Sequence, residues 1–267
     1  MCSQNLILAT FLVSIMKYLF ILFFAFISSI SKAQGTYEIE PSRMEVKYVV
    51  SYLGDYHNKT LGKTSNLCAL RCGSTTSQFF CYERVREDSL EFVPGGFELL
   101  SKERHDDGIE QTYTPFRGEF IYRNNTNGVY TVYGRCMGEH YEFKDSVCMN
   151  WTIDQDSTRM ILGYKCQKAE TDFRGRHWVV WFAADIPLCL GPWKIAGLPG
   201  LVLRAECLGF LEIEANGIFT KGLTPVKFYN YYEKKFTIIN RKKFLKIKTN
   251  PLSYPKGAMM IPQMELE

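Results

Sequence analysis

Apolar side chains alternate with mostly polar ones in the first part of this chain, a pattern that a β-strand produces and a helix does not. Met44, Val46, Tyr48, Val50 and Tyr52 occupy every second position of one continuous segment. Because successive side chains of a strand point to opposite faces, these five side chains lie on one face. A strand satisfies its backbone only by pairing with others, so the segment predicts a β-sheet protein.

Turn sequences predict two hairpins in the middle of the chain. The first joins residues 119–123 to residues 129–135 through an Asn-Asn-Thr-Asn-Gly connection, whose Asn and Gly residues tolerate positive φ. The second joins residues 159–171 to residues 177–183, and Gly175 in the connection has the backbone freedom that a tight turn requires. Both pairs are expected to be antiparallel.

Segments rich in Gly, Pro, Ser and Thr predict loops between the strands. Residues 68–76 and residues 186–200 are assigned to loops on this basis. Residues 237–248 combine apolar and basic residues and are closed by Pro251, so one amphipathic helix is expected there. Short strands are expected in four further segments, 79–86, 91–93, 201–205 and 210–219.

The amino terminus has the features of an export signal. Read from Met16, it has one positive charge, a long apolar run and the small-residue ending Ser31-Lys32-Ala33. Residues 1–33 are therefore expected to be an upstream extension plus a signal peptide, with the true start at Met16 and the mature chain beginning at Gln34. The alternative is an uncleaved membrane anchor, because residues 6–30 are long enough to span a bilayer.

Net charge and missing motifs argue against several classes of function. The formal net charge of +4 is too close to neutral for a nucleic-acid-binding protein. Basic residues gather only between residues 234 and 248, where a solvated helix face is expected rather than a membrane or polyanion site. The sequence has no phosphate-binding loop, zinc-protease motif or nucleophile elbow. We therefore assign no catalytic residue, no metal site and no cofactor.

Eight cysteines follow residue 33, and an even number in an exported protein is typical of disulfide bridges. Each bridge would stabilise the fold by about 2–4 kcal/mol, and the sequence leaves the pairing open. Zinc is the alternative, but the Cys68 and Cys72 pair has no second close Cys or His pair to complete four ligands. The candidates for bridging are Cys68, Cys72, Cys81, Cys136, Cys148, Cys166, Cys189 and Cys207.

The most specific motif of the chain covers residues 191–203. Residues 191–203 read Gly-Pro-Trp-Lys-Ile-Ala-Gly-Leu-Pro-Gly-Leu-Val-Leu and closely resemble the signature of the GLPGLI family, exported proteins typical of Bacteroidota. Residues 162–169, 173–178 and 181–187 resemble the same family in order and spacing. Val202, which replaces the family's isoleucine, is a conservative departure.

The resemblance implies a β-rich fold similar to the curved, bowl-like accessory domains of some bacterial glycan-removing enzymes, and it implies no established activity. Together with the strand pattern it predicts a mainly β protein, either a single antiparallel curved sheet or an open half-barrel or bowl, with one C-terminal amphipathic helix. Residues 34–267 are expected to form a single GLPGLI-type β domain whose signature region is residues 150–220.

The signature loop, residues 191–200, is suited to hold one backbone shape. Its glycines allow conformations that other residues avoid, its prolines fix φ, and two large apolar side chains offer anchors. We expect a packed structural crossover, and the alternative is a loop that binds a ligand or partner. The residues concerned are Gly191, Pro192, Trp193, Gly197, Leu198, Pro199 and Gly200.

Four basic residues lie in and around the second predicted hairpin, namely Lys168, Arg174, Arg176 and His177. They could receive an anionic ligand, although an internal salt bridge, for example with Asp185, is the expected use.

Export, cysteine content and the missing catalytic motifs together predict a non-enzymatic binding or assembly module of the cell envelope. The expected location is the periplasm, the outer-membrane surface or the exterior, and an outer-membrane or surface protein is the partner considered. One alternative is a carrier of an apolar ligand on the concave face of the sheet, suggested by an aromatic content of 15%. The other is an envelope hydrolase with an unrecognised site.

Overall fold

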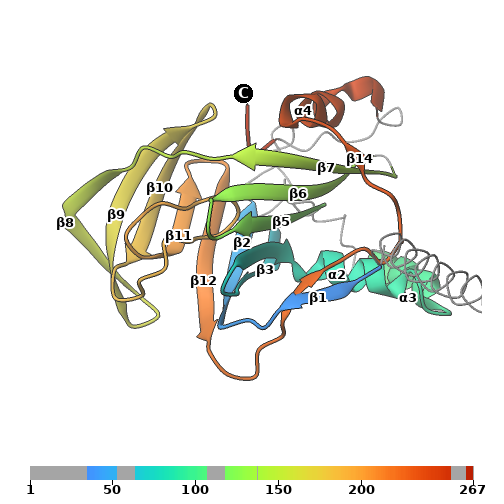
Figure 1. Cartoon of the computed structure of the whole chain (residues 1–267), viewed down its shortest axis with the longest axis horizontal. Coiled ribbons are helices and arrows are strands. Elements are labelled where there is room, and N and C mark those ends of the chain that lie inside the picture. The colour runs from blue at the N-terminus through green and yellow to red at the C-terminus, as the bar shows by residue number, and fades with distance from the viewer. Residues whose placement is uncertain (1–34, 53–63, 107–117, 137, 254–262, 267) are drawn as a thin grey trace, which may run out of the picture.

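The computed structural model describes residues 35–52, 64–106, 118–136, 138–253 and 263–266, so the expected extension and signal peptide lie outside the described residues. The strands are β1 (Tyr37–Glu40), β2 (Met44–Tyr52), β3 (Thr64–Cys72), β4 (Thr76–Cys81), β5 (Glu119–Asn124), β6 (Val129–Cys136), β7 (Glu139–Ser146), β8 (Thr152–Ile161), β9 (Tyr164–Phe173), β10 (Arg176–Ala183), β11 (Leu201–Cys207), β12 (Leu211–Phe219), β13 (Val226–Phe228) and β14 (Thr237–Ile238). The helices are α2 (Tyr82–Leu90), α3 (Gly96–Asp106) and α4 (Arg241–Thr249), and a short 3-10 helix, η1 (Pro251–Ser253), follows α4 (Figure 1).

Twelve of these strands form one large sheet, in the order β14-β7-β6-β5-β4-β3-β2-β12-β11-β10-β9-β8. Neighbouring strands are antiparallel except β14 and β7, which are parallel. In the described part of the chain β14 and β8 are the two edges and do not pair, so the sheet does not close into a barrel. The predicted mainly β class is confirmed. The large sheet is mostly antiparallel, as expected, but it includes one parallel pair, and β1 pairs with β13 in a separate two-stranded sheet rather than in a single one.

Both predicted hairpins form at the expected turns. Between β5 and β6, the Asn124 Oδ1 atom accepts hydrogen bonds from the backbone amides of Thr126 and Asn127, and Gly128 has a φ of +74°. Between β9 and β10, Arg174 and Gly175 both have positive φ, at +49° and +79°. Two such residues in a two-residue loop match the right-handed twist of the flanking strands. A further turn at Leu162 and Gly163 divides the predicted strand at 159–171 into β8 and β9.

The predictions around residue 80 are wrong in two respects. Residues 82–90 form helix α2 rather than a strand, and residues 91–93 lie in the turn between α2 and α3. The charged residues that follow Cys81 are good helix formers, and a central strand would have had to bury them. The predicted loop at 68–76 is mostly strand, because β3 continues to Cys72.

The predicted C-terminal helix is confirmed as α4, although it begins at Arg241 because the residues before it pair with β7 as β14. Its Asn240 cap accepts a hydrogen bond from the Lys243 amide at 2.8 Å. Phe244 is fully buried on the sheet, where a Cβ atom at Gly134 would come within 2.5 Å of its ring. No helix among the described residues combines the length and the apolar content needed to cross a membrane.

Candidate binding site

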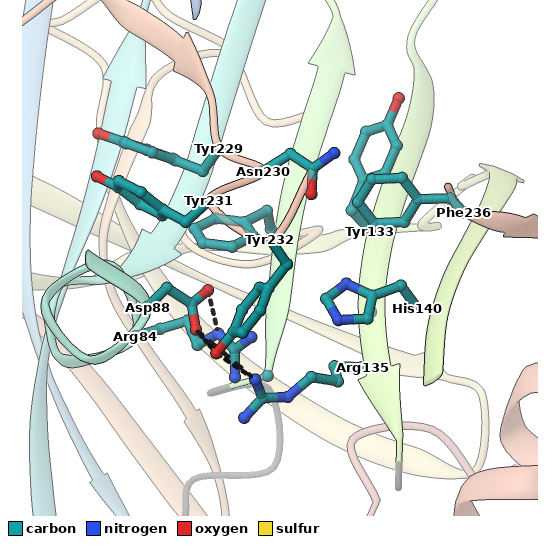
Figure 2. Close-up of a pocket in the computed structure, with 13 residues that line it drawn as sticks. Arg84, Asp88, Tyr133, Arg135, His140, Tyr229, Asn230, Tyr231, Tyr232 and Phe236 are labelled. Atoms are coloured by element: carbon teal, nitrogen blue, oxygen red, sulfur yellow. Dashed lines mark hydrogen bonds and ion pairs between the residues drawn. The ribbon is translucent and has the colours of Figure 1, made fainter. Parts of the chain in front are cut away.

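A small pocket lies where α2, β6, β7 and the connection between β13 and β14 come together (Figure 2). Its free volume is about 20 Å³, which is room for about one water molecule. Aromatic rings and two arginine side chains form most of its wall. The pocket is therefore too small to enclose a ligand and is a shallow recess in the surface.

Regular secondary structure positions the charged groups of the pocket. Arg84 and Asp88 are four residues apart on α2 and so lie on one face of the helix. Tyr133 and Arg135 are two residues apart on β6 and so point to the same side of the sheet. His140 on β7 is directly opposite Arg135 in the antiparallel register. Two strands and one helix thus bring these five side chains together.

Asp88 organises the polar side of the pocket. Arg84 Nε donates to Asp88 Oδ2 at 2.8 Å, and the Tyr232 hydroxyl lies 3.1 Å from Oδ1 and also contacts Glu91. Arg135 Nη1 donates to the Tyr232 hydroxyl oxygen at 2.7 Å. Burial raises the pKa of Asp88, and the charges of Arg84 and Arg135 oppose that shift. With both oxygens engaged and 4% of its side chain exposed, Asp88 positions its neighbours.

The aromatic side of the pocket surrounds His140. Its ring centroid lies 5.2 Å from that of Tyr232 and 5.7 Å from that of Phe236, and Tyr133 packs on Phe236 at 4.8 Å. The Asn230 side chain donates to the Lys234 carbonyl at 3.1 Å and so holds the turn that precedes Phe236. This turn is what brings Tyr232 over the sheet.

His140 is held neutral in this setting. Partial burial, with the nearby charges of Arg135 and Arg84, lowers its pKa to about 4 from an ordinary value of 6.5. The imidazole therefore carries no charge near neutral pH, where its edge can donate or accept a hydrogen bond.

Acid is expected to destabilise the protein through this histidine. The folded-state pKa lies below the unfolded value, so between about pH 6.5 and about pH 4 the unfolded chain binds a proton that the folded chain does not. The free energy of unfolding should therefore fall as the pH decreases through this window. Urea denaturation of the wild type and of His140→Gln over that range measures the effect. The difference in the free energy of unfolding between the wild type and the variant should change with pH. A difference that stays constant over this range would contradict the lowered pKa of His140.

The signature loop lies in the core of the large sheet. Trp193 is 3% exposed and Leu198 is 1% exposed, as predicted, and the Trp193 ring stacks on Trp178 of β10 at 5.6 Å. Gly197 has a φ of +95°, and at Gly200 a Cβ atom would collide with the backbone carbonyl of Ala183. These contacts agree with the structural interpretation of the loop.

The four basic residues near the second hairpin divide into two groups. Lys168 pairs with Glu170 at a partly exposed position, and His177 Nδ1 lies 2.8 Å from Asp172 Oδ1 at an exposed one. Arg174 and Arg176 instead contact the C-terminal segment, residues 263–266. The expected internal salt bridges are present, but their acidic partners are Glu170, Asp172, Asp145 and Glu265 rather than Asp185.

The cysteines are spread over the sheet, and none of those described is at disulfide bonding distance from another. Cys72, Cys136, Cys166 and Cys207 are on β3, β6, β9 and β11, and no two of these strands are neighbours. A disulfide needs Cα atoms within about 7 Å, which neighbouring strands provide and more distant ones do not. Only Cys68 and Cys81 are cross-strand partners, with their sulfur atoms 2.7 Å apart.

The prediction that most of the eight cysteines are bridged is therefore wrong, since none of those described is at bonding distance. Cys68 and Cys81 are the one described pair that lies close enough for a bridge to be expected. Both side chains are fully buried, and burial raises the pKa of the Cys68 thiol, so the bridge is expected to form during folding, before the sulfurs are enclosed. Alkylation in denaturant without reductant, followed by peptide mapping, should leave this pair unlabelled. Exposed Cys148 and Cys189 serve as labelled controls. Full labelling of Cys68 and Cys81 would exclude the bridge.

No pattern in the sequence predicted the pocket. The spacing of Arg84 and Asp88 has meaning only on a helix, and that segment was assigned to a strand. The one sequence feature that could have indicated the pocket is the aromatic segment from Tyr229 to Tyr232, where three of four consecutive residues are tyrosines. The opposition of Arg135 and His140 depends on strand register, which the composition does not specify.

Comparison with known proteins finds similarity only among solved structures. No protein-family model matches the sequence, and no curated protein is significantly similar to it. Two structures of PNGF-II, in space groups C2 and P21, are similar to this chain with TM-scores of 0.49 and 0.48 and identities of 18% and 17%. The similarity covers 76% and 77% of this chain but 32% and 33% of the PNGF-II chains, so this chain spans about a third of their length.

Proposed function

We propose that this chain is an exported, GLPGLI-type binding module of the cell envelope, and that the pocket in Figure 2 is its binding site. The observation that carries the proposal is the position of the Arg135 guanidinium beside a group of aromatic rings, 5.4 Å from the Tyr232 ring centroid. Aromatic faces pack against flat ring faces, and a guanidinium binds a carboxylate through two parallel N–H donors. The ligand class is a ring compound that carries a carboxylate, such as an acidic sugar.

The charge of the pocket supports an anionic ligand. Among the side chains that line it, two arginines face one carboxylate, Asp88, and His140 is neutral near pH 7. The Arg135 side chain is 31% exposed, whereas that of Arg84 is 7% exposed and is engaged by Asp88. Arg135 is therefore the group that a ligand would meet first.

The hydrolase alternative has less support from this pocket. A general acid or base must come within hydrogen-bond reach of the substrate. Asp88 is buried beneath Arg84 and Tyr232, and a histidine with a pKa of about 4 is a weak base. The two titratable groups are better suited to position the wall of a binding site than to transfer a proton.

The carrier alternative requires an apolar cavity on one face of the sheet. Trp193 contacts Trp178 and Phe173, and its loop neighbour Lys194 lies over the ring of Phe143 on β7. The signature loop thus contacts β10 and β7, which are far apart in the strand order. These contacts support a sheet that bends around the loop. The space beside Trp193 is about 10 Å³, too small for an apolar ligand.

Export is supported by the amino-terminal sequence, with its positive charge, apolar run and small-residue ending at Ala33. The GLPGLI-type assignment is supported by the signature at residues 191–203 and by the β-rich fold that the resemblance implies.

Binding of glucuronate, compared with glucose, tests the proposed site. The wild type should bind glucuronate more tightly than glucose, and Arg135→Gln should weaken glucuronate binding about 10- to 100-fold, the loss of one charged hydrogen-bond pair. Arg159→Gln is the matched control, because Arg159 is exposed on β8 at the other edge of the sheet. Equal affinity for the two sugars, or equal effects of the two substitutions, would overturn the proposal.

A further inference from the structure

The C-terminal segment, residues 263–266, is seated in a site of its own. Gln263, Met264 and Glu265 are between 5% and 7% exposed, although no strand or helix includes them. Their contacts come from three distant parts of the chain, namely the signature loop, the β9–β10 turn and α4. Because no helix or strand ladder holds this segment, its burial depends on specific side-chain and main-chain contacts.

The Glu265 carboxylate is the centre of these contacts. It lies 2.6 Å from Lys194 Nζ, 2.9 Å from Arg174 Nη1 and 2.6 Å from Arg241 Nη1. Lys194 and Arg174 also bind Asp145 of β7, at 2.8 Å and 2.7 Å. Without Glu265, Lys194 and Arg174 would share the one carboxylate of Asp145, so these two cations are arranged to receive a second carboxylate.

Further contacts hold the main chain on both sides of Glu265. Arg176 Nε donates to the Gln263 and Met264 carbonyl oxygens at 3.0 and 3.1 Å, and the Leu266 amide donates to the Arg174 carbonyl at 3.0 Å. Met264 is buried in the main core, in a recess with Phe143 and Phe244. Main-chain capture, an apolar recess and a triple cation site together define a short sequence with a residue like Met before Glu.

We propose that Arg174, Arg176, Lys194 and Arg241 form a binding site for acidic peptide segments, of which residues 263–266 are the resident occupant. Tethering gives the chain's own segment a high effective concentration, so it excludes a competing peptide until its own contacts are weakened. The partner that fits is a second polypeptide that presents an apolar residue followed by glutamate. The inference is independent of the sugar pocket, because the two sites use different side chains.

A peptide added to the full chain tests the proposal. The probe is fluorescent Gln-Met-Glu-Leu with an amidated end, and its anisotropy is followed with the wild type and with Glu265→Gln. The variant should bind the probe at least about tenfold more tightly than the wild type, because its own tail competes less. Its thermal midpoint should rise with the probe while that of the wild type stays unchanged. The same probe with Gln in place of Glu should bind neither protein.

Glu214→Gln is the matched control, since Glu214 is an exposed carboxylate that pairs with Arg204 on the sheet. This variant should bind the probe as poorly as the wild type. If Glu265→Gln fails to fold, Met264→Ala weakens the tail by a different contact and should give the same gain. Equal probe binding by wild type and tail variants, or equal binding of the Glu and Gln probes, would overturn the proposal.

Discussion

Replacing Trp193 by alanine is expected to lower the free energy of unfolding by about 3–5 kcal/mol, the cost of removing a buried Trp ring. The ring is 3% exposed and packs against Trp178 and Phe173 at centroid distances of 5.6 and 6.1 Å. Trp193 also has a φ of +56°, a conformation that costs a non-glycine residue about 1–2 kcal/mol. Alanine would keep this strain and lose the packing that compensates for it.

Thermal and urea unfolding of Trp193→Ala and Leu198→Ala measure the effect. Leu208→Ala is the control, because Leu208 is 89% exposed and its loss should change stability little. Midpoints that stay unchanged in both loop variants would contradict the structural role of the signature loop. The loop would then be the leading candidate for a recognition surface.

Replacing Lys194 by alanine is expected to cost about 3 kcal/mol, the lower end of the range for breaking a buried ion pair, since Arg174 and Arg241 still compensate Asp145 and Glu265. Lys194 is 2% exposed and binds both carboxylates. Burial would raise the pKa of Asp145, but hydrogen bonds from Arg174 and Lys194 outweigh it and hold the pKa below its ordinary value.

Lys168→Ala is the control for charge loss alone. Its pair with Glu170 is partly exposed, so its removal should change stability by about 1 kcal/mol or less. Urea unfolding of the two lysine variants, at one pH and one salt concentration, compares them directly. A Lys194 effect no larger than that of Lys168 would mean that the buried cluster contributes nothing to the fold.

Local patterns were enough to predict much of the fold. The alternation around Tyr48, the Asn-Gly turn before β6 and the basic, amphipathic segment around Phe244 each depend on neighbouring residues alone, and each element forms. The burial of Trp193 and Leu198 was also predictable, because large apolar side chains are usually buried and the Gly- and Pro-rich loop that carries them holds one backbone shape.

The sites depend on contacts between distant residues, which local patterns do not encode. Arg174 stood out as a basic residue beside a turn, but its partner Glu265 lies near the chain end and Asp145 lies on a strand at the other side of the sheet order. The pocket requires β6 and β7 in one register, and it requires helix α2 in a segment that was predicted to be partly strand. Tertiary packing decided both outcomes.

We propose that the signature loop supports the fold and that the pocket around Arg135 binds the ligand. Calorimetric titration of glucuronate into Arg135→Gln and Leu198→Ala, corrected for the folded fraction of each, tests it most directly. We predict that Arg135→Gln keeps its thermal midpoint and binds glucuronate about 10- to 100-fold more weakly, whereas folded Leu198→Ala binds as the wild type does. Retained binding by Arg135→Gln, together with lost binding by folded Leu198→Ala, would contradict the claim and place the recognition surface on the loop.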